Sequence, residues 1–269
     1  MRVVSWNLAY MKPARFKKVE NRRRQWKFLG SLQPDIAMLQ ECRPKDLINL
    51  APFEMKNEYK VLGKIPPHWS ACSALLLRSD FIANAEHLPP SSPWLEYLSG
   101  YLCLASFNIY GRNILIASVH TPAKVVNDPL VSQDDHAKIK RPSLDRAWHN
   151  DLAAAALAAT LASKSVGFDG FIISGDWNTA RLFDKVMGGT ACAEFFAMRV
   201  DNGWYESLRK FYADEVQTFL APKGKPYELD HMFTDSALYE KLISCKVIRS
   251  EMSDDLSDHA PIVANFDLA

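Results

Sequence analysis

The segment Phe171-Ile172-Ile173-Ser174-Gly175-Asp176-Trp177-Asn178 is an apolar run that ends in a polar glycine turn. The run predicts a short buried strand, and the turn directs Asp176 and Asn178 out of one end of a sheet. A second segment, Ser257-Asp258-His259-Ala260-Pro261, places Asp258 and His259 directly before another apolar strand. Carboxylates, an amide and an imidazole at one sheet edge suit a divalent cation and a phosphate ester.

Composition limits the class of protein. The chain has 269 residues, 48% of them hydrophobic, so we expect one large core and a single domain over residues 1–269. Lysine and arginine number 32 against 31 acidic residues, and the net charge of +1 gives no overall attraction to nucleic acid. The five cysteines lack CxxC spacing, which favours small core residues in a reducing compartment.

No targeting or membrane-spanning segment is predicted. The first residues lead directly into a strand without the apolar region of a signal peptide. Uncharged apolar runs remain well short of a membrane span. We therefore expect a soluble, cytoplasmic protein.

Strand-like and helix-like segments alternate along the chain. Apolar spacing predicts a helix over 18–32, and an alanine-rich stretch predicts another over 151–165. A polar, proline-containing stretch, 121–146, is expected to be an irregular surface excursion. Besides 171–174, strands are predicted at 2–6, 35–40, 73–78, 101–110 and 113–119, the last two joined by a hairpin turn at Gly111-Arg112.

Six short motifs follow one another in an order known from one superfamily. They are Ser5-Trp6-Asn7, Leu39-Gln40-Glu41, Ser118-Val119-His120, Gly175-Asp176-Trp177-Asn178, Leu229-Asp230-His231 and Ser257-Asp258-His259. The chain resembles the endonuclease/exonuclease/phosphatase, or DNase I-like, superfamily, which includes exonuclease III-type AP endonucleases, sphingomyelinases, inositol-phosphate 5-phosphatases and deadenylases. The resemblance implies an α/β fold, a four-layered α/β sandwich with two packed β-sheets flanked by helices and a site at one rim.

The resemblance also implies a site for Mg²⁺ or Mn²⁺. Glu41 matches the position that binds the metal in the family, and a carboxylate that ends an apolar strand is costly unless it is paired. Asp258 would help to bind the metal, and Asn7 would hydrogen-bond the site carboxylates or the phosphate. The alternative for Glu41 is a salt bridge to Arg43 or Lys45, and the alternative for Asn7 is a turn-forming role.

Catalytic roles follow from the same resemblance. Asp176 would orient or deprotonate the attacking water, and Asn178 would donate to a phosphoryl oxygen. His259 would act on the scissile phosphate as a base or an electrophile, with Asp230 fixing its ring. His120 matches a position that contacts the phosphate or assists the leaving group. Its alternative is a strand-end histidine satisfied by backbone.

His231 is expected to point away from the site. It follows Asp230 directly, and successive side chains of a strand face opposite sides. Ala9 stands where many exonuclease III-type nucleases carry an acid, so one tightly bound ion is expected.

Candidate substrate-binding residues are basic or aromatic. Residues 12–27 hold eight basic side chains, including Arg22, Arg23 and Arg24, with Phe16 and Trp26 among them. Cations interleaved with aromatics suit a nucleic-acid backbone with stackable bases, although a solvated helix face has the same pattern.

An aromatic pocket is a second candidate. Tyr227, with Phe219 and Leu229, would lie beside the last motifs, although three such residues are more often core.

Three functions are compatible with these observations. A metal-dependent nuclease that acts on DNA or RNA is favoured, followed by a phosphodiesterase or phosphatase with a small-molecule or lipid substrate. A non-catalytic binding module is least favoured, because all the residues that catalysis would need are present.

Overall fold

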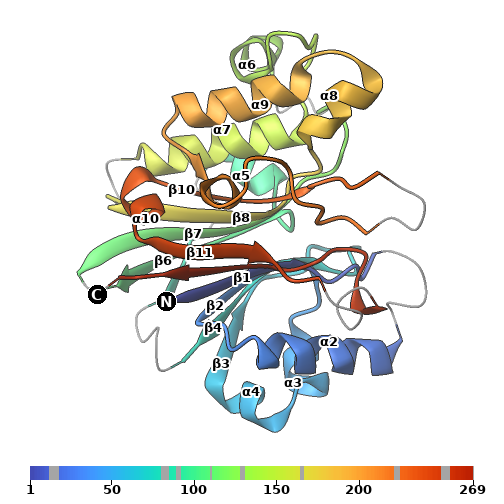
Figure 1. Cartoon of the computed structure of the whole chain (residues 1–269), viewed down its shortest axis with the longest axis vertical. Helices are drawn as coiled ribbons and strands as arrows, with labels where there is room; N and C mark the ends of the chain where they lie inside the picture. Colours follow the sequence, from blue (N-terminus) through green and yellow to red (C-terminus); the bar gives the residue numbers. More distant parts are fainter. Residues whose placement is uncertain are drawn as a thin grey trace.

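Two six-stranded sheets pack face to face between helical layers in this computed structural model (Figure 1). The structure describes residues 1–11, 18–79, 85–88, 92–109, 111–127, 131–163, 167–220, 225–249 and 255–268. The predicted four-layered α/β sandwich is confirmed.

The first sheet has the strand order β11-β12-β1-β2-β4-β3 and is covered by α2, α3 and α4 (Figure 1). Its strands are β1 (Arg2–Asn7), β2 (Ile36–Cys42), β3 (Tyr59–Leu62), β4 (Cys72–Arg78), β11 (Leu242–Val247) and β12 (Ile262–Phe266). The helices are α2 (Val19–Ser31), α3 (Lys45–Leu50) and α4 (Phe53–Glu58).

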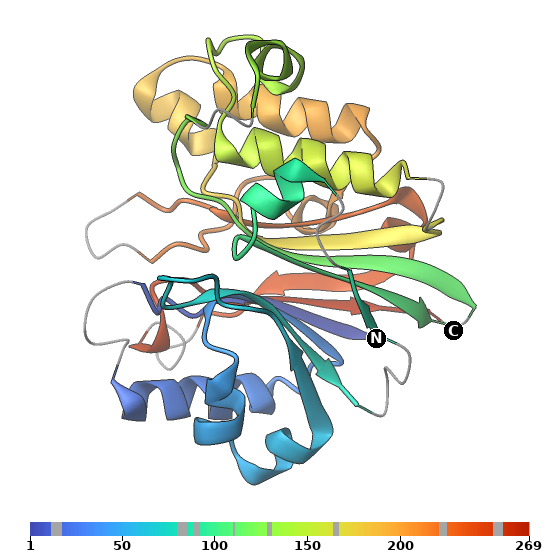
Figure 2. The ribbon, with the colours of Figure 1, turned by 180° about the vertical axis from the view of Figure 1, so that it is seen from behind.

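The second sheet has the order β5-β6-β7-β8-β10-β9, with α7 and α9 lying over its outer face (Figure 2). Its strands are β5 (Glu86–His87), β6 (Leu102–Ile109), β7 (Arg112–His120), β8 (Gly170–Asp176), β9 (Tyr205–Glu206) and β10 (Asp230–Thr234). The remaining helices are α5 (Pro93–Tyr97), α6 (Gln133–Ile139), α7 (His149–Leu161), α8 (Arg181–Met187), α9 (Ala191–Asp201), α10 (Ser236–Glu240) and a 3₁₀ turn, Ser207–Lys210.

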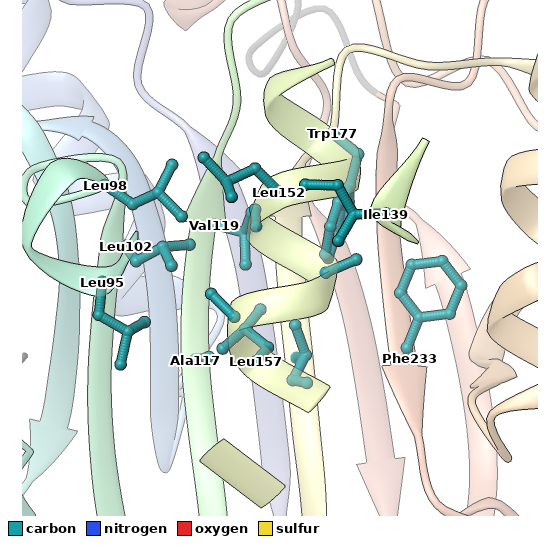
Figure 3. Close-up of a cluster of buried hydrophobic side chains, with 14 of the residues drawn as sticks. Leu95, Leu98, Leu102, Ala117, Val119, Ile139, Leu152, Leu157, Trp177 and Phe233 are labelled. Carbon is teal, nitrogen blue, oxygen red and sulfur yellow. The ribbon is translucent and has the colours of Figure 1, made fainter. Parts of the chain in front are cut away.

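Apolar side chains fill all three spaces between the layers. One cluster lies between the sheets and joins Ile36 and Leu75 to Ile116 and Ile172. Others lie under α2 and under α7, where Leu152 and Leu157 contact the second sheet (Figure 3). The central strands are covered on both faces, which explains why they appear in the sequence as continuous apolar runs.

Strand direction brings the motif residues to one rim, at the end of β1 away from the N label in Figure 1. Strands β1 and β2 are parallel, as are β7 and β8, so both pairs end at this edge. Strands β10 and β12 run antiparallel to β8 and β1 and therefore begin there.

Close backbone approach requires a glycine in β8. A Cβ on Gly175 would lie 1.8 Å from the carbonyl oxygen of Val119, and its φ is +153°. A side chain here would push β7 and β8 apart directly below Asp176.

The predicted strands and helices are present, with shifted ends. The predicted hairpin joins β6 and β7, which pair along their whole length. The surface excursion is not irregular throughout, because Ser132 accepts a hydrogen bond from the Asp135 N–H and so caps α6. Among the described residues, no helix has both the length and the apolar character that crossing a membrane requires.

Candidate active site

The two sheets meet at the rim through a hydrogen bond between motif residues. Asp176 lies opposite His120 on one side and Asp230 on the other in the strand register. Asn7, at the end of β1 in the other sheet, donates from Nδ2 to Asp176 Oδ2 at 3.0 Å. Side chains from both sheets therefore converge on one carboxylate.

Asp230, His259 and Asp176 lie in a line. His259 Nδ1 is 2.8 Å from Asp230 Oδ2, a short charge-assisted hydrogen bond. The other ring nitrogen, Nε2, is 3.7 Å from Asp176 Oδ2 and 4.0 Å from Asp258 Oδ1. These distances exceed a hydrogen bond, so Nε2 remains available to a ligand.

Burial and neighbouring charges shift the pKa values of Asp230, His259 and Asp176. Burial alone would lower the pKa of His259, but the negative charges of Asp230 and Asp176 raise it to about 10. Burial raises the pKa of Asp176 to about 6, partly offset by the charge of His259. Burial opposes ionisation of Asp230 too, but the charge and hydrogen bond of His259 keep its pKa below the ordinary value. The imidazole is therefore cationic at neutral pH.

Glu41 sits in a bulge of β2 with its carboxylate buried. The register with β4 shifts between Leu39 and Cys42, and Glu41 has a φ of +48°. Oε2 accepts a hydrogen bond from the Met11 N–H at 2.5 Å. The bulge re-aims this side chain, for which the sequence pattern indicates only a strand end.

His120 lies between the two acidic groups. Its Nε2 is 3.9 Å from Glu41 Oε1 and 3.8 Å from Asp176 Oδ2. The ring is mostly buried at the end of β7, and the backbone N–H of His120 donates to the Tyr101 carbonyl at 2.8 Å.

Asn178 is held by the turn that follows β8. Its backbone N–H donates to Asp176 Oδ1 at 2.9 Å, and its Nδ2 donates to the Thr121 carbonyl at 2.8 Å. The amide is thus fixed beside Asp176, in a left-handed backbone conformation with φ +47°.

Two hydroxyl groups support the site, and sequence reasoning assigns neither of them a role. Ser257 donates to the Asn7 carbonyl at 2.6 Å and accepts from the His259 N–H at 3.1 Å. Thr218 accepts from the Asp230 N–H at 3.1 Å. Ser257 is visible as the first residue of its motif, whereas no local pattern marks Thr218.

The substrate-binding candidates on α2 differ in burial and in how closely they pair with acidic residues. Arg22 is mostly buried and binds Asp46 at 2.6 Å. Arg23 and Arg24 are exposed, with Glu20 at 3.8 Å and Asp255 at 4.0 Å. The basic and aromatic candidates within 12–17 lie outside the described residues.

Two other candidates are placed by specific contacts. The Tyr227 ring packs against the Phe183 ring, with centroids 4.5 Å apart. His231 points away from Asp176, as expected, and contacts Glu206 at 3.1 Å and the Thr179 carbonyl at 2.9 Å.

The acidic groups at the rim could bind a metal ion. Within the described residues no lysine or arginine pairs with the buried Glu41, because Arg43 instead bonds the Tyr10 hydroxyl at 2.8 Å. A buried carboxylate without a cationic partner is costly, and a bound cation would remove that cost. Carboxylate oxygens are hard donors, so the donor set fits a divalent cation of the Mg²⁺ class.

Solved structures share this architecture. An AP endonuclease from Archaeoglobus fulgidus matches at 16% identity over 100% of both chains, with a TM-score of 0.64. A 3'-5' exonuclease (NExo) from Neisseria meningitidis matches at 18% identity over 99% of this chain and 100% of that chain, with a TM-score of 0.66. The fold is that of DNase I-like nucleases.

A third neighbour carries nucleic acid. The 3' phosphatase NExo from Neisseria, bound to a product DNA hairpin, matches at 18% identity over 99% of both chains with a TM-score of 0.64. No protein-family model and no curated protein matches the sequence. At 16–18% identity these likenesses establish the fold.

Proposed function

We propose that this protein is a divalent-metal-dependent phosphodiester hydrolase that cleaves a polynucleotide. The observation that carries the proposal is Asp176, a buried carboxylate held by Asn7 and Asn178 and faced by the cationic His259. A base and a positively charged donor on one reacting centre are what phosphoryl transfer by water requires. The DNA-acting solved neighbours support the choice of a polynucleotide.

Asp176 orients the attacking water and accepts its proton. Both carboxylate oxygens are held by N–H donors, so the group is fixed relative to the sheet edge. Because burial raises the pKa of Asp176 to about 6, the carboxylate is more basic than an exposed one yet largely ionised at neutral pH.

His259 acts as the electrophile rather than the base. Its raised pKa means that Nε2 carries a proton at neutral pH, and that N–H can donate to a phosphoryl oxygen as charge develops there. Asp230 holds the ring in place from the opposite nitrogen. Asn178 offers a second donor, and His120 lies where it can contact the phosphate or the leaving oxygen.

Glu41 and Asp258, with Asn7 beside them, would hold Mg²⁺ or Mn²⁺. Such an ion supplies Lewis-acid neutralisation of the phosphate charge.

The proposal is tested by cleavage of single-stranded and duplex oligonucleotides with Mg²⁺ or Mn²⁺ and with EDTA. Cleavage should require the metal, and Asp176→Asn and His259→Ala should each lower kcat by about two decades with little change in KM. His87→Ala is the matched control, because this histidine is exposed on β5. A near-normal kcat in His259→Ala would contradict the proposed mechanism. Hydrolysis of small phosphodiesters without any cleavage of oligonucleotides would show that the substrate is not a polynucleotide.

A further inference from the structure

Two partly exposed aromatic rings pack against each other, and one of them lies next to His120. Tyr101 precedes β6 and lies beside His120, with ring centroids 6.3 Å apart and an angle of 76° between the ring planes. The Trp69 ring packs edge-on against Tyr101 at 4.5 Å. The pair extends the rim away from Asp176, on the His120 side.

The loop that carries Trp69 is held firmly against the second sheet. Gly100 has a φ of +87°, and a Cβ there would lie 2.5 Å from Pro66 Cγ and 3.1 Å from Trp69 Cε3. Ser73 ties the same turn, with its N–H bonded to the Gly100 carbonyl at 2.8 Å and its hydroxyl to the Tyr101 carbonyl at 2.7 Å. The indole is therefore positioned before any ligand arrives.

The polar atoms of both rings are unused. Within the described residues, neither the Trp69 indole N–H nor the Tyr101 hydroxyl makes a hydrogen bond, and both side chains are partly exposed. Two other aromatics near the rim, Tyr97 and Trp6, are hydrogen-bonded. The Tyr97 hydroxyl bonds His149 Nε2 at 2.9 Å, and the Trp6 N–H bonds the His259 carbonyl at 2.8 Å. Packing alone does not satisfy Trp69 and Tyr101.

We propose that Trp69 and Tyr101 form a stacking subsite for the nucleobase next to the scissile phosphate, an inference that rests on the proposed function. A flat indole takes the face of any base, and the free N–H and hydroxyl can reach the base edge, sugar or phosphate. Every base has such a face, so the subsite reads the presence of a base rather than its identity.

The subsite also selects the form of the substrate. A base in a duplex is already stacked on its neighbours and must be moved out before it can stack on Trp69. Substrates with an unpaired nucleotide beside the cleaved bond are therefore cleaved better than continuous duplex.

The test compares two oligonucleotides that differ only by a base. One is a single-stranded oligonucleotide, and the other carries an abasic sugar beside the scissile phosphate, at each side in turn. Stacking on an aromatic side chain is worth roughly ten-fold or more per base. Wild type should therefore prefer the complete substrate in kcat/KM at one of the two positions, and Trp69→Ala should abolish that preference while cleaving the abasic substrate at the wild-type rate.

Trp69→Phe, which keeps a ring, should retain most of the preference, and Phe53→Ala should retain all of it. Phe53 is the matched control, because it is 73% exposed on α4. If Trp69→Ala keeps the preference, or slows both substrates equally, the stacking subsite is wrong while the nuclease activity of the wild type still stands. If the wild type cleaves no oligonucleotide, the proposed function fails and the subsite fails with it.

Discussion

Glu41 and Asn178 both adopt left-handed backbone conformations, with φ +48° and +47°. Asparagine tolerates this region, but for glutamate it costs roughly 1–2 kcal/mol. The cost is met at Glu41 by a bulge and by the Met11 N–H, which hold the carboxylate at the rim. Backbone strain of this kind concentrates at functional sites, which supports a ligand-binding role for Glu41.

Replacing Glu41 by glutamine should weaken Mg²⁺ binding about ten-fold or more without unfolding the protein. The amide keeps an acceptor for the Met11 N–H but removes the negative charge that a hard cation needs. Isothermal titration calorimetry with Mg²⁺ and Mn²⁺ measures the change, and Glu54→Gln on α4 is a control. Unchanged affinity in Glu41→Gln would show that this carboxylate is not a ligand.

Replacing Asp230 by asparagine should move the pH profile of the reaction. The negative charge of Asp230 raises the pKa of His259, so removing it lowers that pKa. The limb of the kcat profile that His259 sets should shift to lower pH, with a smaller loss of kcat than in His259→Ala. An unshifted profile in Asp230→Asn would mean that His259 does not titrate in the reaction.

At the scale of elements, the sequence predicts best what is buried on both faces. Strand β8 and the inner strands appear as apolar runs, and α7 as an alanine-rich helix, because burial dictates their composition. The sequence does not predict the short helices α3 and α4, since one or two turns leave too little periodicity to detect. In the case of α6, the polar composition and the flanking prolines of the excursion conceal the helix.

The arginines of α2 should divide into a structural and an electrostatic group. Arg22→Ala should lower the free energy of unfolding by about 1–3 kcal/mol, since it leaves the mostly buried Asp46 without its partner. Arg23→Ala and Arg24→Ala should leave stability unchanged. If they contact phosphate, they should flatten the slope of log K against log salt by about one for each phosphate that the variant no longer neutralises.

Urea unfolding and oligonucleotide binding at several salt concentrations measure the two effects on α2. Lys241→Ala, an exposed cation at the opposite edge of the sheets, is the control. A wild-type salt slope in both exposed variants would mean that this helix face does not contact the substrate.

At the scale of the molecule, the site depends on contacts that no local pattern contains. The motifs identify the strand ends, because each places an acid, an amide or a histidine next to an apolar run. Which strand ends meet is decided by the strand order in two separate sheets and by the packing of those sheets, as in the Asn7–Asp176 hydrogen bond between them. Thr218 and the Trp69–Tyr101 pair likewise lie in or beside loops whose positions follow from the packed fold.

A second buried charge cluster lies behind the rim. His231 contacts Glu206 at 3.1 Å and Glu228 at 3.4 Å, while Arg181 and Arg209 bind the same two carboxylates. With His231 protonated, three positive charges face two carboxylates, and the two arginines make the cluster a poor place for a further cation. Burial alone would lower the pKa of His231, but the two glutamates raise it to about 10.

This cluster should make folding stability fall at alkaline pH. Because the pKa of His231 is higher in the folded state than the roughly 6.5 of an unfolded chain, the folded state binds the extra proton between these values. The contribution is fully present below about pH 6.5 and is lost as pH rises toward 10. His259 contributes in the same direction. His231→Gln should therefore reduce the slope of the unfolding free energy against pH by the equivalent of up to one proton, and the part of the slope that comes from His259 should remain. Urea unfolding in metal-free buffer across this range measures the slope, with His87→Ala as the control. If His231→Gln loses stability equally at every pH, the histidine is neutral in the folded protein and the ion-paired cluster is wrong.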